Sequence, residues 1–195
     1  MNSRFQSIVD FIRAQFPDKD FIPLHEPLFT GNERKYVLDA IDSTFVSSVG
    51  AYVSKFEEMM ASITDSRFAV ATVNGTSALH MALLVAGVKQ GEEVLSQAFT
   101  FIATANAISY TGASPVFIDI DPATMGMSAD KLQAFLEQQV ELKDGQAYNK
   151  NSQKRIAACV PMHSFGLPCE IERIAALCEQ WNIPLIEDAA ESLGS

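Results

Sequence analysis

The chain has 195 residues, of which 48% are hydrophobic and 19% are charged, and its formal net charge is −10. This composition is typical of a soluble globular protein, and the acidic balance argues against binding to nucleic acid or to an anionic membrane, since both need positive charge. No apolar run approaches the roughly 20 residues that a membrane helix needs.

The N-terminal residues and the cysteines bear on localisation. Residues 1–5 are not followed by the long apolar core and small-residue cleavage site of an export signal. Cys159, Cys169 and Cys178 form an odd number with no C-x-x-C pair, which favours a reducing compartment over a disulfide framework or a structural zinc site. We therefore expect a cytoplasmic protein without a metal centre.

The first third of the chain is predicted to be helical. Apolar residues at helical spacing predict helices over 8–16, 33–42 and 52–64. Pro17 ends the first of them, and the segment 21–27, which contains two prolines, is expected to be extended.

From residue 67 onward, strand and helix patterns alternate. Strands are predicted over 67–73, 93–95, 115–120, 155–162 and 184–186. Helices are predicted over 77–88, 103–110, 129–139 and 170–181, with Ser128 capping the third, and the polar segment 146–153 is predicted to be a loop. This alternation predicts an α/β fold with a mainly parallel sheet and helices on both faces, whose sites form beyond the carboxyl ends of the strands.

The first such strand end carries a candidate anion site. Residues 74–78 read Asn-Gly-Thr-Ser-Ala directly before a helix. Gly75 permits a close backbone approach, while Thr76 and Ser77 offer hydroxyl groups and can cap the helix, whose N-terminus suits a phosphate. An ordinary strand-to-helix turn explains the same residues equally well.

Two further strand ends carry an aromatic ring and a pair of acids. Phe101 follows the second strand and could stack on a flat heteroaromatic ring, although a core phenylalanine is the simpler explanation. Asp188 and Glu191 follow the last strand, where a carboxylate could pair with a protonated ring nitrogen or simply complement a helix dipole. A phosphate cradle, a stacking face and a carboxylate together are what pyridoxal 5′-phosphate (PLP) requires.

These motifs resemble one enzyme family closely. GTSALH (75–80), TFIATAN (100–106), FIDID (117–121) and EDAAESLG (187–194) are similar to the DegT/DnrJ/EryC1/StrS aminotransferases, which are fold-type I PLP enzymes that aminate keto-sugars attached to nucleotides. The resemblance runs from about residue 8 to the last residue. Segments 22–27, 45–53, 146–154 and 160–163 resemble the subgroup that acts in bacillosamine and legionaminic acid synthesis.

The resemblance implies a role for each matching residue. Gly75, Thr76 and Ser77 would hold the cofactor phosphate, and Phe101 would lie against the pyridine ring. The remaining roles concern the polar edge of the ring, where Asp188 would pair with the ring nitrogen as the catalytic carboxylate and Glu191 would contact the phenolic oxygen. Ser47 and Ser48 would lie near the substrate or the dimer partner.

The resemblance also implies the reaction and its partners. The complete enzyme would transfer the amino group of L-glutamate to the 4-keto group of a UDP-linked 4-keto-6-deoxy-hexosamine, for bacterial surface-glycan synthesis, and would act as a cytoplasmic homodimer. Residues 1–195 would form the N-terminal part of the large PLP-binding domain. The Schiff-base lysine and the small C-terminal domain would lie beyond Ser195, so that this chain alone is expected to be catalytically incomplete.

Several alternatives stay open at this point. A PLP-dependent keto-sugar dehydratase of the same fold and a non-catalytic paralogue share these motifs. Asp119 and Asp121 could suggest a metal site, but Pro122 and the missing EF-hand glycine favour a turn after a strand. The histidines at positions 25, 80 and 163 form no H-E-x-x-H motif and are expected to be structural or to lie on the surface.

Overall fold

The structure, a computed structural model, describes residues 3–24, 26–48 and 50–195. His25 and Val49, which belong to segments of the resemblance, lie outside the described residues. The chain divides into two compact units, Met1–Ser54 and Lys55–Ser195.

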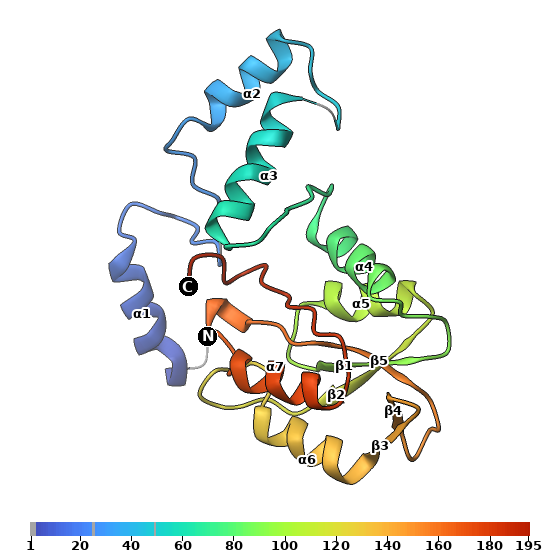
Figure 1. The fold of residues 1–195 in the computed structure, drawn as a ribbon. Coiled ribbons are helices and arrows are strands. Elements are labelled where there is room, and N and C mark those ends of the chain that lie inside the picture. Colours follow the sequence, from blue (N-terminus) through green and yellow to red (C-terminus); the bar gives the residue numbers. More distant parts are fainter. Residues whose placement is uncertain (1–2, 25, 49) are drawn as a thin grey trace. The chain divides into compact units, whose positions relative to one another are not determined.

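The first unit is helical, as predicted. It contains a short 3-10 helix η1 (Ser3–Phe5), α1 (Gln6–Gln15), α2 (Glu33–Asp42) and the start of α3 (Ala51–Ile63) (Figure 1). The predicted helices agree with these bounds to within two residues. None of the three α-helices contains a buried residue, however, so the apolar faces expected to point inward are not covered.

The second unit is built on a parallel sheet. Its strands are β1 (Glu93–Gln97), β2 (Ser114–Ile118) and β5 (Ile156–Val160), in the order β2-β1-β5. Leu95 lies opposite Val116 on one side and Cys159 on the other, and both pairings are parallel. Every residue of the central strand β1 is buried.

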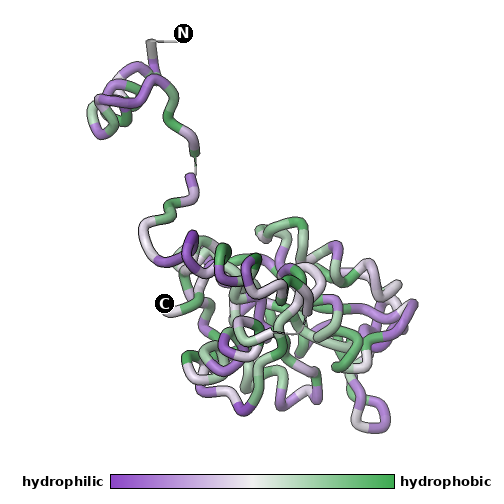
Figure 2. Tube along the Cα trace, turned by 90° about the horizontal axis from the view of Figure 1, so that it is seen from above, coloured by the Kyte–Doolittle hydropathy of each residue, from purple (hydrophilic) through white to green (hydrophobic). Residues whose placement is uncertain are grey.

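Helices cover both faces of this sheet (Figure 1). Val94 points to the face where Leu83 of α4 (Gly75–Val85) and Ile108 of α5 (Ile102–Tyr110) pack. Leu95, the next residue, points to the opposite face, where α6 (Ala129–Gln139) and α7 (Ile171–Gln180) contribute a second core cluster that includes Leu132 and Ile174. The predicted α/β sheet with helices on both faces is therefore confirmed. In Figure 2, hydrophobic stretches run through the interior of this unit, and hydrophilic ones lie at its outer turns.

The predicted strand over 67–73 is wrong. This segment has no regular secondary structure and pairs with no strand in the described chain, and Phe68, Val70 and Val73 are all at least 80% exposed. Among the described residues, its backbone bonds to another segment at one point, where Ala71 N–H donates to the Glu57 carboxylate at 2.8 Å. A β-rich sequence forms a strand only where a neighbouring strand completes the hydrogen-bond ladder, and the described residues provide none for this segment.

The predicted loop over 146–153 is also wrong in its first half. Strand β4 (Gln146–Asn149) pairs in antiparallel fashion with β3 (Val140–Lys143). Asp144 and Gly145 join the two strands, with φ values of 51° and 75°. An Asp-Gly pair of this kind is the preferred two-residue hairpin turn, because both positions require positive φ.

The predicted strand over 184–186 is only partly formed. The chain runs parallel to β5 through isolated bridges, Cys159 to Leu185 and Met162 to Asp188, and is not assigned as a strand. Cys159 N–H donates to Pro184 O, and Ile186 N–H donates to Cys159 O. Pro184 has no N–H to extend the ladder, but the bonds that form still bring residue 188 to the edge of the sheet.

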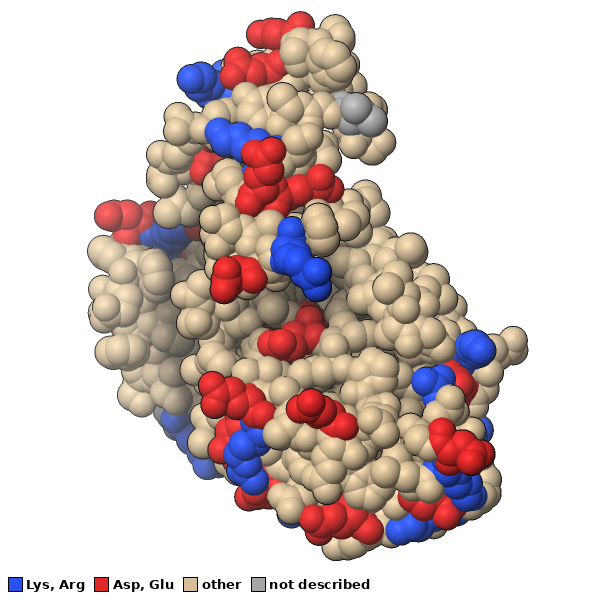
Figure 3. All heavy atoms as spheres, viewed as in Figure 1, with Lys and Arg blue, Asp and Glu red and all other residues tan. Residues whose placement is uncertain are grey.

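The surface of the second unit carries charges of both signs. Over the lower part of the face shown in Figure 3, basic side chains lie among acidic ones. The ion pairs of the second unit include Arg155–Glu92 and Arg173–Asp130. Within the described ranges, no helix has both the length and the apolar character needed to cross a membrane.

Candidate functional site

Five of the six predicted cofactor residues line one cavity. Gly75, Thr76, Phe101, Asp188 and Glu191 surround a space of about 310 Å³. The other lining residues are Leu79, Ala103, Met162 and Ala190. All of them belong to the second unit, and the segments after β1 and β5 meet here, at the carboxyl edge of the sheet, where α/β proteins place their ligands.

The start of α4 forms one end of this cavity. Asn74, and not Thr76 or Ser77 as expected, caps the helix: its side-chain oxygen accepts from Ser77 N–H at 2.9 Å, and its carbonyl accepts from Ala78 N–H at 3.1 Å. The N–H groups of Gly75 and Thr76 have no acceptor among the hydrogen bonds of the described residues. A side chain added at Gly75 would meet no atom within 4 Å, so there is room for a ligand beside its backbone. Two free N–H groups at a helix N-terminus form an anion site.

Asp188 is a buried carboxylate, with an exposed fraction of 6%. Thr104 Oγ1 donates to its Oδ2 atom at 2.7 Å, and Ala190 N–H makes a long contact of 3.4 Å with its Oδ1 atom. No ion pair found in the described residues includes Asp188. A buried carboxylate without a cationic partner is unfavourable, so this position is suited to receive a cationic group from a ligand.

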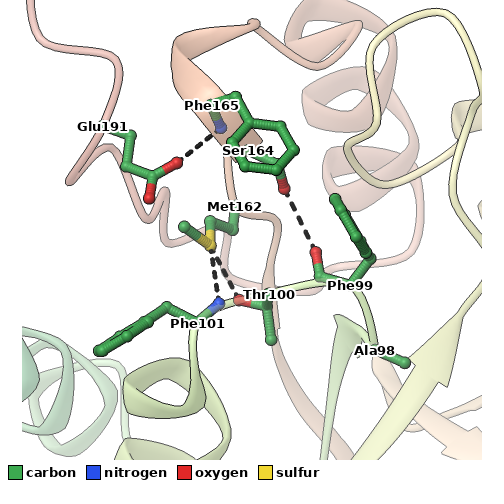
Figure 4. A pocket seen from close by; sticks show the side chains of 8 residues that line it. All are labelled: Ala98, Phe99, Thr100, Phe101, Met162, Ser164, Phe165 and Glu191. Atoms are coloured by element: carbon green, nitrogen blue, oxygen red, sulfur yellow. Dashed lines mark hydrogen bonds between the residues drawn. The ribbon is translucent and has the colours of Figure 1, made fainter. Parts of the chain in front are cut away.

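Phe101 lies at the rim of the cavity with 65% of its surface exposed, which rules out the core-phenylalanine explanation. Its backbone N–H contacts Met162 Sδ at 3.3 Å, and Thr100 Oγ1 lies 2.9 Å from the same sulfur. Figure 4 shows both contacts, with the Phe101 ring directed away from the sulfur. The ring therefore presents an uncovered face against which a planar ligand can stack.

Glu191 stands between this cavity and an adjoining one of about 290 Å³, which is lined by Phe99, Thr100, Ser164 and Phe165 among others. One oxygen of its carboxylate accepts from Phe165 N–H at 2.6 Å (Figure 4). Phe165 has a φ of 58°, a left-handed conformation that is unfavourable for a bulky residue. The strained backbone thus directs its N–H group to Glu191.

His163 has a structural role. Its Nδ1 atom accepts from Cys169 N–H at 3.0 Å, so the ring proton is on Nε2, which lies 3.2 Å from the Glu187 carboxylate. Both ring nitrogens are thereby engaged. Burial raises the pKa of the neighbouring Cys169 thiol. Asp121 forms a turn, as expected, with its carboxylate accepting from Ala123 N–H at 2.6 Å.

Sequence reasoning missed three residues of the site, namely Thr104, Met162 and Phe165. Each is close to a predicted residue in space. Thr104 and Met162 lie in segments that carry the resemblance, but no role was assigned to them. Ser47, expected near the substrate, lines a separate cavity of about 490 Å³ in the first unit.

Comparison with known proteins identifies the family. Residues 28–195 match the profile of the DegT/DnrJ/EryC1/StrS aminotransferase family. The chain belongs to this family. Aminotransferases of the family use PLP, and the fold-type I architecture inferred from the sequence is confirmed by structures of its members.

Curated relatives carry related names. The chain is 41% identical over 175 residues to GDP-perosamine synthase of Escherichia coli O157:H7, covering 90% of this chain and 44% of the relative. It is 38% identical over 174 residues to EpsN of Bacillus subtilis, a putative pyridoxal phosphate-dependent aminotransferase, covering 89% of this chain and 42% of the relative. The chain thus spans less than half the length of these relatives.

Solved structures share the fold. The aminotransferase from Psychrobacter cryohalolentis is 32% identical with a TM-score of 0.73, over 88% of this chain and 40% of that one. A 3-amino-5-hydroxybenzoic acid synthase is 29% identical with a TM-score of 0.72, over 89% and 41%. A GDP-4-keto-6-deoxymannose-3-dehydratase, at 22% identity and a TM-score of 0.71, over 90% and 42%, shares the fold alone.

Proposed function

We propose that this chain supplies the cofactor site of a PLP-dependent aminotransferase, and that residues 1–195 form the N-terminal part of its large domain. The observation that carries the proposal is that a buried carboxylate without a cation, at Asp188, lines the same cavity as the two free N–H groups at the start of α4. PLP carries both complementary groups, a protonated ring nitrogen and a phosphate.

Each residue then has a defined task. Gly75 and Thr76 bind the phosphate through their N–H groups, and Ser77 contributes its hydroxyl, because its own N–H is held by Asn74. Phe101 provides the stacking face. When bound, PLP supplies a conjugated ring that withdraws electrons from the substrate amine carbon.

Two carboxylates control the polar edge of the bound ring. Asp188 holds the proton on the ring nitrogen, which keeps the ring electron-deficient. Phe165 N–H holds one oxygen of the Glu191 carboxylate, and the other oxygen would contact the phenolic oxygen of the cofactor. Both acids follow the stretch 184–186, which runs beside β5, so their separation is fixed by one short length of backbone.

The proposed substrates are L-glutamate as the amino donor and a nucleotide-linked 4-keto-6-deoxy sugar as the acceptor. The subgroup resemblance supports a UDP-linked hexosamine, whereas the relatives named GDP-perosamine synthase support a GDP-linked sugar. Binding of UDP-linked and GDP-linked sugars to the same preparation distinguishes the two. The proposed cytoplasmic homodimer is tested by the mass of the protein in solution.

We further propose that the amine that holds PLP covalently does not come from residues 1–195. None of the described residues that line the cavity is a lysine. In a single-turnover assay, this chain mixed with PLP and L-glutamate should give no pyridoxamine phosphate at an enzymatic rate. Conversion at such a rate would contradict this part of the proposal.

The decisive test of the cofactor site is direct binding. Pyridoxamine phosphate is the suitable probe, because its amine cannot form an imine with surface lysines. We expect saturable binding to this chain, weakened by inorganic phosphate, and failure to bind refutes the proposal. For the two alternatives, cofactor absorbance in a full-length protein excludes a non-catalytic paralogue, and borohydride trapping of a lysine excludes the dehydratase.

A further inference from the structure

Two threonine hydroxyls connect Asp188 to Met162 Sδ. Thr104 Oγ1 lies 2.7 Å from Asp188 Oδ2, and Thr100 Oγ1 lies 2.8 Å from Thr104 Oγ1. Thr100 Oγ1 also lies 2.9 Å from Met162 Sδ. Thr104 is 1% exposed, so its hydroxyl depends on these two neighbours and not on solvent.

Each hydroxyl has a single proton, so the order of the row depends on whether Asp188 Oδ2 accepts or donates. If Oδ2 accepts, Thr104 donates to it and Thr100 donates to Thr104. If Oδ2 carries a proton and donates to Thr104, the order reverses, and Met162 Sδ is then the acceptor nearest to the Thr100 hydroxyl.

The two orders differ in energy because their last acceptors differ. In the first order the final acceptor is a carboxylate, which forms the stronger charge-assisted hydrogen bond. In the second order it is a thioether sulfur, which is a weak acceptor. The row therefore favours Asp188 Oδ2 as the final acceptor and fixes the orientation of this atom.

We propose that Thr104, supported by Thr100, is a positioning residue that donates to Asp188 Oδ2 and orients the carboxylate toward a cationic aromatic ring nitrogen. This inference rests on the proposed function, since it assigns a task to residues behind the cofactor cavity. Neither threonine needs to touch the cofactor ring, because both act through the carboxylate.

The test compares two ligands that differ at one atom. One is pyridoxamine phosphate, and the other is its benzene analogue, in which CH replaces the ring nitrogen. The ratio of their dissociation constants measures the contact between the ring nitrogen and Asp188, because phosphate binding and ring stacking are common to both. A general loosening of the cavity weakens both ligands and leaves the ratio unchanged.

Three variants of this chain separate positioning from packing. Thr104→Val keeps the shape of the side chain and removes the hydroxyl, while Thr104→Ser keeps the hydroxyl. Thr111→Val makes the same change beyond the far end of α5, where the hydroxyl bonds to Ile108 O. Thermal unfolding of each variant confirms that it is folded.

We expect the wild type to prefer pyridoxamine phosphate over the analogue. Thr104→Val should reduce this preference about tenfold, the scale of one hydrogen bond to a charged group, while Thr104→Ser should keep it within about threefold and Thr111→Val should not change it. Should Thr104→Val fail to fold, Thr100→Val decides, with a smaller loss of preference in the same direction.

Contrary results have distinct meanings. An unchanged preference in the variant that decides, or a loss of preference in Thr104→Ser equal to that in Thr104→Val, overturns the positioning role and leaves the proposed function intact. Binding of pyridoxamine phosphate without any preference in the wild type overturns the role of Asp188. The absence of binding overturns the proposed function and this inference with it.

Discussion

Replacement of Asp188 by Asn should change ligand binding and stability in opposite directions. The substitution keeps the size of the side chain and removes its charge. The carboxylate is 6% exposed and has no cationic partner among the described residues, so its burial carries a desolvation penalty of several kcal/mol. The hydrogen bond from Thr104 offsets part of this penalty, and it becomes a weaker neutral bond in the variant.

The two contributions set the expected magnitudes. Relief of the buried charge outweighs the weakened bond, so Asp188→Asn should raise the free energy of unfolding of the ligand-free chain by about 1–2 kcal/mol. The same change should weaken binding of pyridoxamine phosphate by about 10- to 100-fold, since a charge-assisted bond contributes about 1.5–3 kcal/mol.

Urea unfolding and fluorescence titration measure the two effects. Asp130→Asn is the matched control, because the Asp130 side chain is 77% exposed and pairs with Arg173 on the surface. Its effect on both measurements should be small. If Asp188→Asn instead destabilises the chain and leaves binding unchanged, the carboxylate is a structural acceptor and the reasoning fails.

Further predictions concern the fold. Leu83→Ala should destabilise the chain by about 2–5 kcal/mol in urea unfolding, because Leu83 is fully buried, whereas Val85→Ala on the same helix, at 84% exposure, should have almost no effect. Gly145→Ala should cost about 1 kcal/mol by the same assay, because the residue has a φ of 75°; an unchanged stability would show that the hairpin turn tolerates a side chain. Burial raises the pKa of Cys169, so the folded state retains this proton where the unfolded state loses it. The free energy of unfolding should therefore decline as the pH rises through the usual thiol value of 9.0, and less steeply in Cys169→Ala.

Local signals in the sequence were sufficient for most helices. Ser128 caps α6 as predicted, with its hydroxyl accepting from Lys131 N–H at 3.3 Å. The strand over 67–73 could not be judged locally, since its β-rich residues say nothing of whether a partner lies beside them. The β3–β4 hairpin could have been predicted from the sequence, because Asp-Gly at 144–145 is a typical two-residue turn.

The sequence predicted some residues of the site but not others. Phe101 and Asp188 were found because parallel strands bring their carboxyl ends to one edge. Thr104 was not found, since a threonine in the first turn of a helix is common and its partner lies 84 residues away in the chain. Phe165 was not found because its positive φ is a property of the folded backbone and cannot be predicted from the residue type.

Three unfavourable features of the second unit lie around one cavity. In the described part of the chain, every buried polar side-chain atom has a hydrogen-bond partner. Yet an unpaired charge at Asp188, unused N–H groups at Gly75 and Thr76, and a strained backbone at Phe165 all lie at or beside the same space. Such local conflicts typically mark functional sites, where a ligand supplies the missing partners. A ligand with one anionic and one cationic end would resolve the first two together, and its binding should therefore stabilise the fold.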